Sequence, residues 1–128
     1  MRSIVMLVDD EMDILDILTQ VLDEEGYAVV AFHSGRAALD YARIQPPALA
    51  LIDLLMPLMD GRELITRLRA EQRAQFPIVV MSASSNLERV RDLPIQGYIS
   101  KPFDLEHVIQ RVNELIIGAT PLPFADAR

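Results

Sequence analysis

The sequence of 128 residues contains no cysteine, so disulfide bonds, zinc–thiolate sites and cysteine nucleophiles are excluded. This absence is typical of the reducing cytoplasm, where we expect the protein to be located. No segment approaches the roughly 20 apolar residues that a membrane-spanning helix needs. The apolar run near the N-terminus meets acidic residues too early for a signal peptide. We therefore expect no insertion into a membrane.

Basic residues are also few. The sequence has 12 lysines and arginines against 19 aspartates and glutamates, which gives a formal net charge of −7. A chain of this charge is repelled by nucleic-acid phosphates and by anionic lipids. We therefore expect no direct binding to nucleic acid. The apolar content of 51% is enough for the core of one domain.

Short apolar runs recur along the chain and predict the strands of a sheet. They do not alternate with polar residues, which is typical of strands that are covered on both faces in a parallel sheet. The runs are Ile4 to Val8, Ala28 to Phe32, Leu49 to Ile52, Ile78 to Met81 and the shorter Tyr98 to Ile99.

The segments between these runs carry apolar residues at helical spacing. Gly26 is placed to end the first helix, while Ser34, Asp60 and Asp104 are placed to begin later ones. Alternating strands and helices predict an α/β fold: a doubly wound, parallel, five-stranded (βα)5 sheet of order 2-1-3-4-5, in a flavodoxin-like three-layer sandwich. We expect one domain over residues 1–118 and a flexible C-terminal tail over residues 119–128.

Carboxylates gather where the predicted strands end. Asp9 and Asp10 follow the first strand, and Asp53 ends the third. In the 2-1-3-4-5 order these strands are neighbours at the switch point, so the three side chains should converge. Oxygen ligands without histidine or cysteine favour a hard cation, Mg²⁺ or Mn²⁺ in its place. Lys101, after the last strand, opens onto the same edge of the sheet.

Four sequence elements in this order resemble the receiver domain of response regulators in bacterial two-component (phosphorelay) signalling. They are Asp9-Asp10-Glu11, "DLLMPLMDG" from Asp53 to Gly61, Ser82-Ala83 and Lys101-Pro102-Phe103. Taken singly, each residue has an ordinary structural explanation as a helix-start acid, a turn residue or a surface lysine. Their convergence at one edge of the sheet favours a functional site instead. The resemblance covers roughly residues 3 to 117.

The resemblance implies that Asp53 is the phosphoacceptor, with Lys101 neutralising charge on the phosphoryl group. It also implies that Asp10, Asp53 and the backbone carbonyl of Leu55 bind Mg²⁺, and that Asp9 acts through water. The phosphoryl donor would be a sensor histidine kinase or a histidine phosphotransfer protein. The chain would then be a signalling phosphoacceptor rather than an enzyme, promoting only its own phosphorylation and dephosphorylation.

The resemblance further implies a switch made by Ser82 and Tyr98. The Ser82 hydroxyl would move to a phosphoryl oxygen, and Tyr98 on the last strand would turn inward. The changed surface would control an unknown downstream protein. The segment from Ser84 to Gly97 is short and contains Pro94, so we expect its helix to be short or irregular. For this reason we do not carry over the dimer that many receivers form through this region.

Other interpretations stay open. The chain is either a free-standing regulator or a receiver excised from a larger kinase or regulator, and a receiver-like interaction module that acts without phosphorylation is the main rival. A flavodoxin-like electron carrier is disfavoured because acids replace the phosphate-binding donors after the first strand. A phosphohydrolase with an aspartate nucleophile is disfavoured because Leu55 stands where a second carboxylate is usual.

Overall fold

A computed structural model describes residues 2–71 and 75–117, and its described part contains one parallel sheet of five strands in the order β2-β1-β3-β4-β5. The predicted fold class and strand order are therefore confirmed. The strands are β1 (Ile4–Val8), β2 (Ala28–Phe32), β3 (Leu49–Asp53), β4 (Ile78–Ala83) and β5 (Gly97–Lys101). The helices are α1 (Met12–Glu24), α2 (Gly35–Ile44), α3 (Gly61–Glu71), α4 (Leu105–Ile117) and the 3₁₀ helix η1 (Ser84–Val90).

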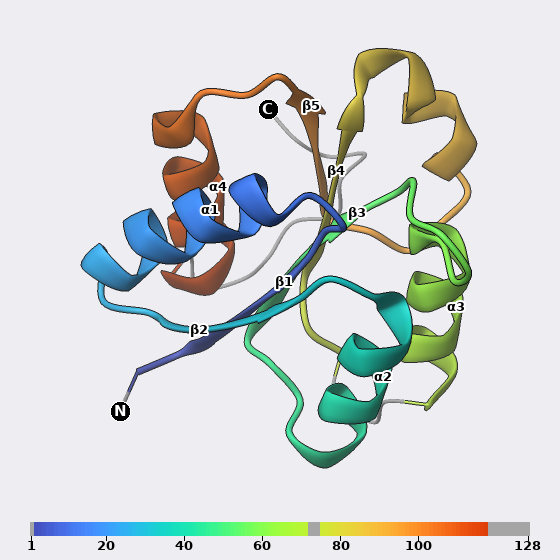
Figure 1. The fold of residues 1–128 in the computed structure, drawn as a ribbon, viewed down its shortest axis with the longest axis horizontal. Coiled ribbons are helices and arrows are strands. Elements are labelled where there is room, and N and C mark those ends of the chain that lie inside the picture. Colours follow the sequence, from blue (N-terminus) through green and yellow to red (C-terminus); the bar gives the residue numbers. More distant parts are fainter. Residues whose placement is uncertain (1, 72–74, 118–128) are drawn as a thin grey trace.

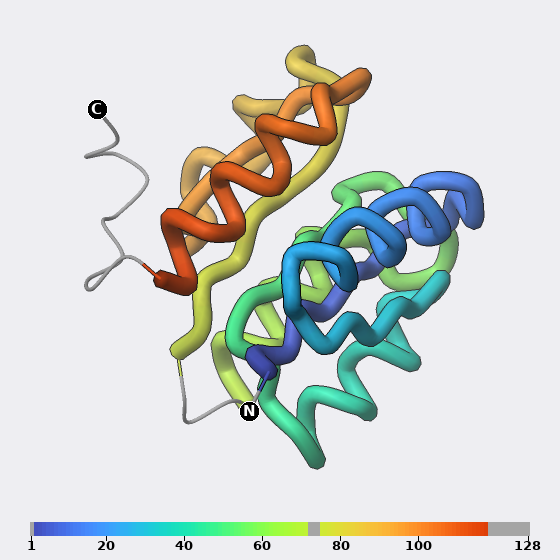
Figure 2. The backbone as a smooth tube through the Cα atoms, turned by 90° about the vertical axis from the view of Figure 1, so that its left-hand side faces the viewer, coloured from blue at the N-terminus to red at the C-terminus, as the bar shows by residue number. Residues whose placement is uncertain are grey.

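Helices cover both faces of the sheet, as the unbroken apolar strands predict. α2 and α3 lie on one face and α1 and α4 on the other (Figure 1). Figure 2 is viewed from the side of α1 and α4, which lie in front of the sheet. Alternate strand residues enter the two cores: Met6 and Ile52 pack towards α2 and α3, whereas Leu7 and Leu51 pack towards α1 and α4. Every residue of β3 is buried, including Asp53 at the end of the strand.

The helix ends follow the sequence signals. Gly26 has a φ of 101°, a conformation that favours glycine, just after α1. The Ser34 hydroxyl accepts a hydrogen bond from the Ala37 N–H at 3.2 Å, and the Asp60 carboxylate accepts one from the Glu63 N–H at 2.9 Å. Asp104 directly precedes α4, where its backbone carbonyl accepts from the amides of the first turn.

The segment between β4 and β5 is short and irregular, as predicted: η1 is a 3₁₀ helix of 7 residues. Two arginines of α3 hold this segment. Arg62 donates to the Arg89 carbonyl at 2.7 Å and pairs with the Asp92 carboxylate. Arg69 donates to the Pro94 carbonyl at 3.0 Å. The segment is therefore fastened to α3 by side-chain contacts.

Residues 118–128 lie outside the described residues, so the domain limits of 1–118 and 119–128 stay predictions. Within residues 2–71 and 75–117, no helix has the length and apolar character that crossing a bilayer requires.

Candidate functional site

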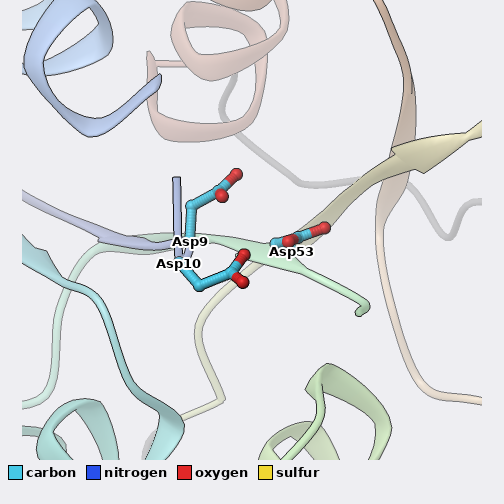
Figure 3. A group of neighbouring side chains, drawn as sticks. All are labelled: Asp9, Asp10 and Asp53. Carbon is cyan, nitrogen blue, oxygen red and sulfur yellow. The ribbon is translucent and has the colours of Figure 1, made fainter. Parts of the chain in front are cut away.

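Three carboxylates meet at the carboxyl edge of the sheet, where β1 and β3 end side by side (Figure 3). Each of Asp9, Asp10 and Asp53 offers a carboxylate oxygen, and these oxygens lie within 4.8 Å of one another. Asp9 and Asp53 are buried, and Asp10 is exposed. The convergence that the strand order predicts is therefore present.

Lys101 reaches into the cluster from the end of β5. Its Nζ lies 2.7 Å from Asp9 Oδ2, 3.2 Å from Glu11 Oε1 and 3.6 Å from Asp53 Oδ1. Burial lowers the pKa of Lys101, but the hydrogen bond to Asp9 and the charges of Asp53 and Asp9 outweigh burial and raise it above its usual value. The lysine is therefore held as a cation, and its closest partner is Asp9.

Asp9 is fully buried and has both oxygens engaged. Its Oδ1 accepts a hydrogen bond from the Glu11 N–H at 2.9 Å, while Oδ2 pairs with Lys101. The water-mediated role that the family resemblance implies for Asp9 stays a prediction.

The surroundings of Asp53 disfavour its charged form. Burial and the neighbouring charge of Asp9 raise its pKa to about 6, although Lys101 and a hydrogen bond from the Leu55 backbone act in the opposite direction. At Asp53, Lys101 therefore does not offset burial and the charge of Asp9. A bound divalent cation would add positive charge, and the all-oxygen donor set fits a hard ion such as Mg²⁺. The Leu55 carbonyl as a further ligand stays a prediction.

Ser82 and Tyr98 lie on the two strands beyond Asp53. Ser82 is buried at the end of β4, and the Asn86 side chain donates a hydrogen bond to its hydroxyl oxygen at 2.9 Å. Tyr98 is partly buried on β5, and its hydroxyl donates to the Ala83 carbonyl oxygen. The described structure thus has Ser82 held by a residue of η1 and Tyr98 held by the end of β4.

The structure adds two residues that sequence reasoning did not place at the site. Gly61, at the start of α3, donates its N–H to the Leu54 carbonyl at 2.8 Å, so this helix begins against the backbone that carries Asp53. Asn86 contacts Ser82 from η1. The sequence placed Gly61 at the end of the motif that begins with Asp53, without giving it a role at the site. An asparagine four residues after Ser82 gave no signal that distinguishes it from a turn residue.

The comparisons with known proteins agree with this geometry. The model of the family described as response regulator receiver domain matches residues 5–113. The chain belongs to the response regulator receiver domain family. Response regulators act in two-component signalling.

Two curated relatives show how much of a longer protein the chain matches. The chain is 37% identical to the transcriptional regulatory protein CreB of Escherichia coli over 118 residues, which are 90% of this chain and 51% of the relative. It is 32% identical to the response regulator GtcR of Aneurinibacillus migulanus over 116 residues, which are 88% of this chain and 47% of the relative. The chain thus spans about half the length of these relatives.

Solved structures share the fold. The receiver domain of a signal transduction histidine kinase from Syntrophus aciditrophicus matches with a TM-score of 0.84 and 23% identity, covering 94% of each chain. The receiver domain of the sensor histidine kinase PA1611 from Pseudomonas aeruginosa matches with a TM-score of 0.78 and 22% identity, covering 92% of this chain and all of the other. That structure holds a magnesium ion in its active-site cleft. The triad of Asp9, Asp10 and Asp53 is consistent with such a site.

The raised pKa of Asp53 predicts that Asp53→Asn stabilises the metal-free protein at neutral pH. The folded carboxyl, with a pKa of about 6 against an ordinary 3.8, holds its proton more tightly than the unfolded one. The contribution of Asp53 to the free energy of unfolding therefore falls as the pH rises from about 4 to 6, and this loss is complete above that window. Asparagine carries no charge, so we expect its free energy of unfolding at pH 7.5 to be higher by about 1–3 kcal/mol.

Urea denaturation in EDTA at pH 4, 5, 6 and 7.5 measures this difference. The exposed Asp16→Asn on α1 is the matched control and should change stability little. The difference in the free energy of unfolding between Asp53→Asn and the native chain should disappear towards pH 4. At pH 7.5 it should become smaller when Mg²⁺ is added. A difference that is constant across this range would contradict the explanation.

Proposed function

We propose that this chain is a phosphoacceptor that takes a phosphoryl group onto Asp53 in a Mg²⁺-dependent reaction and changes conformation in response. One observation carries the proposal. Asp53 is a buried carboxylate with a raised pKa, and it lies beside the Lys101 cation and within reach of two further carboxylates. A merely structural aspartate has no need of this arrangement.

The chemistry is covalent catalysis by a carboxylate. An oxygen of Asp53 attacks the phosphorus of a phosphohistidine, the new O–P bond forms, and the P–N bond breaks. The imidazole leaves with the electron pair and takes up a proton. Such a transfer depends on in-line positioning and on neutralisation of the phosphoryl charge. Lys101 is placed to pair with a phosphoryl oxygen because its Nζ is 3.6 Å from Asp53 Oδ1.

The acidic residues have separate roles in this proposal. Asp10 and Asp53 would hold Mg²⁺ directly, with the Leu55 carbonyl as a third protein ligand, and Asp9 would act through water while it positions Lys101. Bound Mg²⁺, or Mn²⁺ in its place, supplies positive charge to the oxygens of the transferring group. The exposure of Asp10 leaves this edge of the site open to an approaching donor.

The response to phosphorylation would begin at Ser82. A phosphoryl group adds charge and acceptor oxygens at Asp53, and the Ser82 hydroxyl is a nearby donor. When Ser82 turns to a phosphoryl oxygen, Tyr98 would lose its present position and turn inward. β5 and η1 would then present a different surface to a downstream protein.

Exposed apolar side chains beside the site support a protein as the phosphoryl donor. Leu55 and Leu58 in the loop after Asp53, and Met12 at the start of α1, are exposed large hydrophobic residues. A sensor histidine kinase or a histidine phosphotransfer protein would cover them while it delivers the phosphoryl group. Whether the chain works as a free-standing regulator or within a longer kinase or regulator, the reaction at Asp53 would be the same.

The test is the intact mass of the protein after incubation with acetyl phosphate, with and without Mg²⁺, for the native chain and Asp53→Asn. We expect one phosphoryl group on the native chain that requires Mg²⁺, maps to Asp53 and is absent from the variant. Asp16→Asn should be phosphorylated like the native chain, since this residue lies on the exposed face of α1. The absence of an adduct, together with no NMR response to beryllofluoride, would favour an interaction module that acts without phosphorylation.

A further inference from the structure

A buried amide–hydroxyl contact joins η1 to the end of β4. Asn86 Nδ2 donates a hydrogen bond to Ser82 Oγ at 2.9 Å, and the two residues are only 9% and 3% exposed. Asparagine is mostly found at the protein surface, and a buried one normally has a specific hydrogen-bonding partner. Here that partner is the residue of β4 that comes directly after Met81, the register neighbour of Asp53.

We propose that Asn86 is a positioning residue for the phosphoacceptor reaction, holding the Ser82 hydroxyl so that its single proton is free for the group attached to Asp53. The inference rests on the proposed function and names a residue that acts through Ser82 rather than on the phosphoryl group itself. Asn86 meets Ser82 with its side-chain N–H and is therefore the donor of this hydrogen bond, and this polarity decides what Ser82 can do.

A serine hydroxyl can both donate and accept hydrogen bonds. It has one proton to donate and two lone pairs that accept. Because Asn86 donates, it occupies a lone pair of Ser82 Oγ and leaves the proton for another acceptor. A partner that accepted instead would take the proton and leave only lone pairs to face the negative phosphoryl oxygens.

Tyr98 lies on β5, and its hydroxyl donates to the carbonyl of Ala83, the residue that follows Ser82. Burial raises the pKa of Tyr98, and the Ser82 side chain acts in the opposite direction. A shift of Ser82 would therefore change the surroundings of the Tyr98 hydroxyl.

A phosphoryl oxygen on Asp53 would accept the Ser82 proton that Asn86 leaves free. A charged acceptor forms a strong hydrogen bond, so Ser82 would be drawn to the phosphoryl group and the surroundings of Tyr98 would change. Asn86 keeps its bond to Ser82 Oγ in both states and limits the movement of the serine to a rotation of its proton or a small shift.

The experiment compares rates of Mg²⁺-dependent phosphorylation by acetyl phosphate in the full chain, measured by intact mass. We expect Asn86→Ala to lower the rate about three- to tenfold, the range that one neutral hydrogen bond supports. Asn86→Asp has nearly the same shape but reverses the hydrogen bond, so its rate should fall below that of Asn86→Ala. Ser85→Ala, an exposed neighbour in η1, is the matched control.

A double-mutant cycle separates positioning from a structural role in η1. If Asn86 acts through Ser82, then Asn86→Ala has no further effect on the rate in a Ser82→Ala background. NMR of the unphosphorylated protein gives a second readout: Ser82→Ala should shift the side-chain amide signals of Asn86, and beryllofluoride with Mg²⁺ should leave their protection from exchange in place. An unchanged signal in Ser82→Ala would overturn the proposed contact.

The outcomes distinguish this inference from the function on which it rests. No Mg²⁺-dependent adduct on the native chain would overturn the proposed function and this inference together. A native chain that is phosphorylated, with Asn86→Ala and Asn86→Asp reacting equally fast, would overturn the inference alone. Equal effects of Asn86→Ala in the presence and absence of the Ser82 hydroxyl would assign Asn86 to the folding of η1 and also overturn it.

Discussion

Lys101→Met is expected to lower both the stability and the phosphorylation rate of this receiver. The substitution keeps an unbranched side chain but removes the cation that lies 2.7 Å from the fully buried Asp9 carboxylate. A buried charge left without its partner is strongly destabilising, so we expect a loss of about 2–4 kcal/mol in the free energy of unfolding at pH 7.5 in EDTA. Urea denaturation measures this loss.

The phosphorylation rate should fall by a factor of about 100–1,000, because a donor aimed at the transferring group is lost. Intact mass after acetyl phosphate treatment with Mg²⁺ measures this rate, at a temperature at which the variant is folded. Mg²⁺ should restore part of the stability without restoring the rate, since the ion compensates the carboxylates but does not replace the lysine amine.

Two variants serve as controls for Lys101→Met. Arg43→Ala removes the exposed pair between Arg43 and Glu71, and we expect it to cost less than about 1 kcal/mol. Lys101→Arg keeps the charge and should keep most of the stability, while the bulkier planar group should still slow phosphorylation. A rate for Lys101→Met within twofold of the native chain would contradict the role assigned to Lys101.

The fold and the acidic cluster were predictable because few physical rules determine them. Unbroken apolar strands require cover on both faces, and the right-handed crossover limits how successive parallel strands connect. Once β1 and β3 are neighbours, Asp9 and Asp53 must lie close together, since both come at the carboxyl ends of their strands. The irregular η1 followed from the short segment around Pro94.

The pairing inside the site was not predictable from the sequence. The strand order brings Lys101 to the carboxyl edge of the sheet, beside the acidic cluster. Side-chain length and burial then decide that its closest partner is Asp9 rather than Asp53. The contact between Asn86 and Ser82 depends on the 3₁₀ path of η1, for which composition gives no signal. The role of Gly61 was not predictable either, because it depends on how closely α3 approaches the β3 backbone.

Gly61→Ala is expected to destabilise the protein by about 2–4 kcal/mol, because the added methyl group has no room and its neighbours are backbone atoms. A Cβ at this position would lie 2.4 Å from the Asp53 carbonyl oxygen and 2.8 Å from the Leu54 Cα. The start of α3 would have to move away from the end of β3, and this shift would weaken the hydrogen bond from the Gly61 N–H to the Leu54 carbonyl.

The same shift should displace the phosphoacceptor, so that the phosphorylation rate of folded Gly61→Ala falls at least tenfold, a loss that a misplacement of about 1 Å accounts for. Gly26→Ala is the matched control. Its Cβ meets nothing within 4 Å, but its φ of 101° makes alanine strained, at a cost of about 1–2 kcal/mol. Gly26 follows α1 at the opposite end from the site, so this variant should lose stability and keep its rate. If both variants lost stability and neither lost rate, the contact of Gly61 would serve the fold alone, and the position of Asp53 would not depend on how closely α3 packs against it.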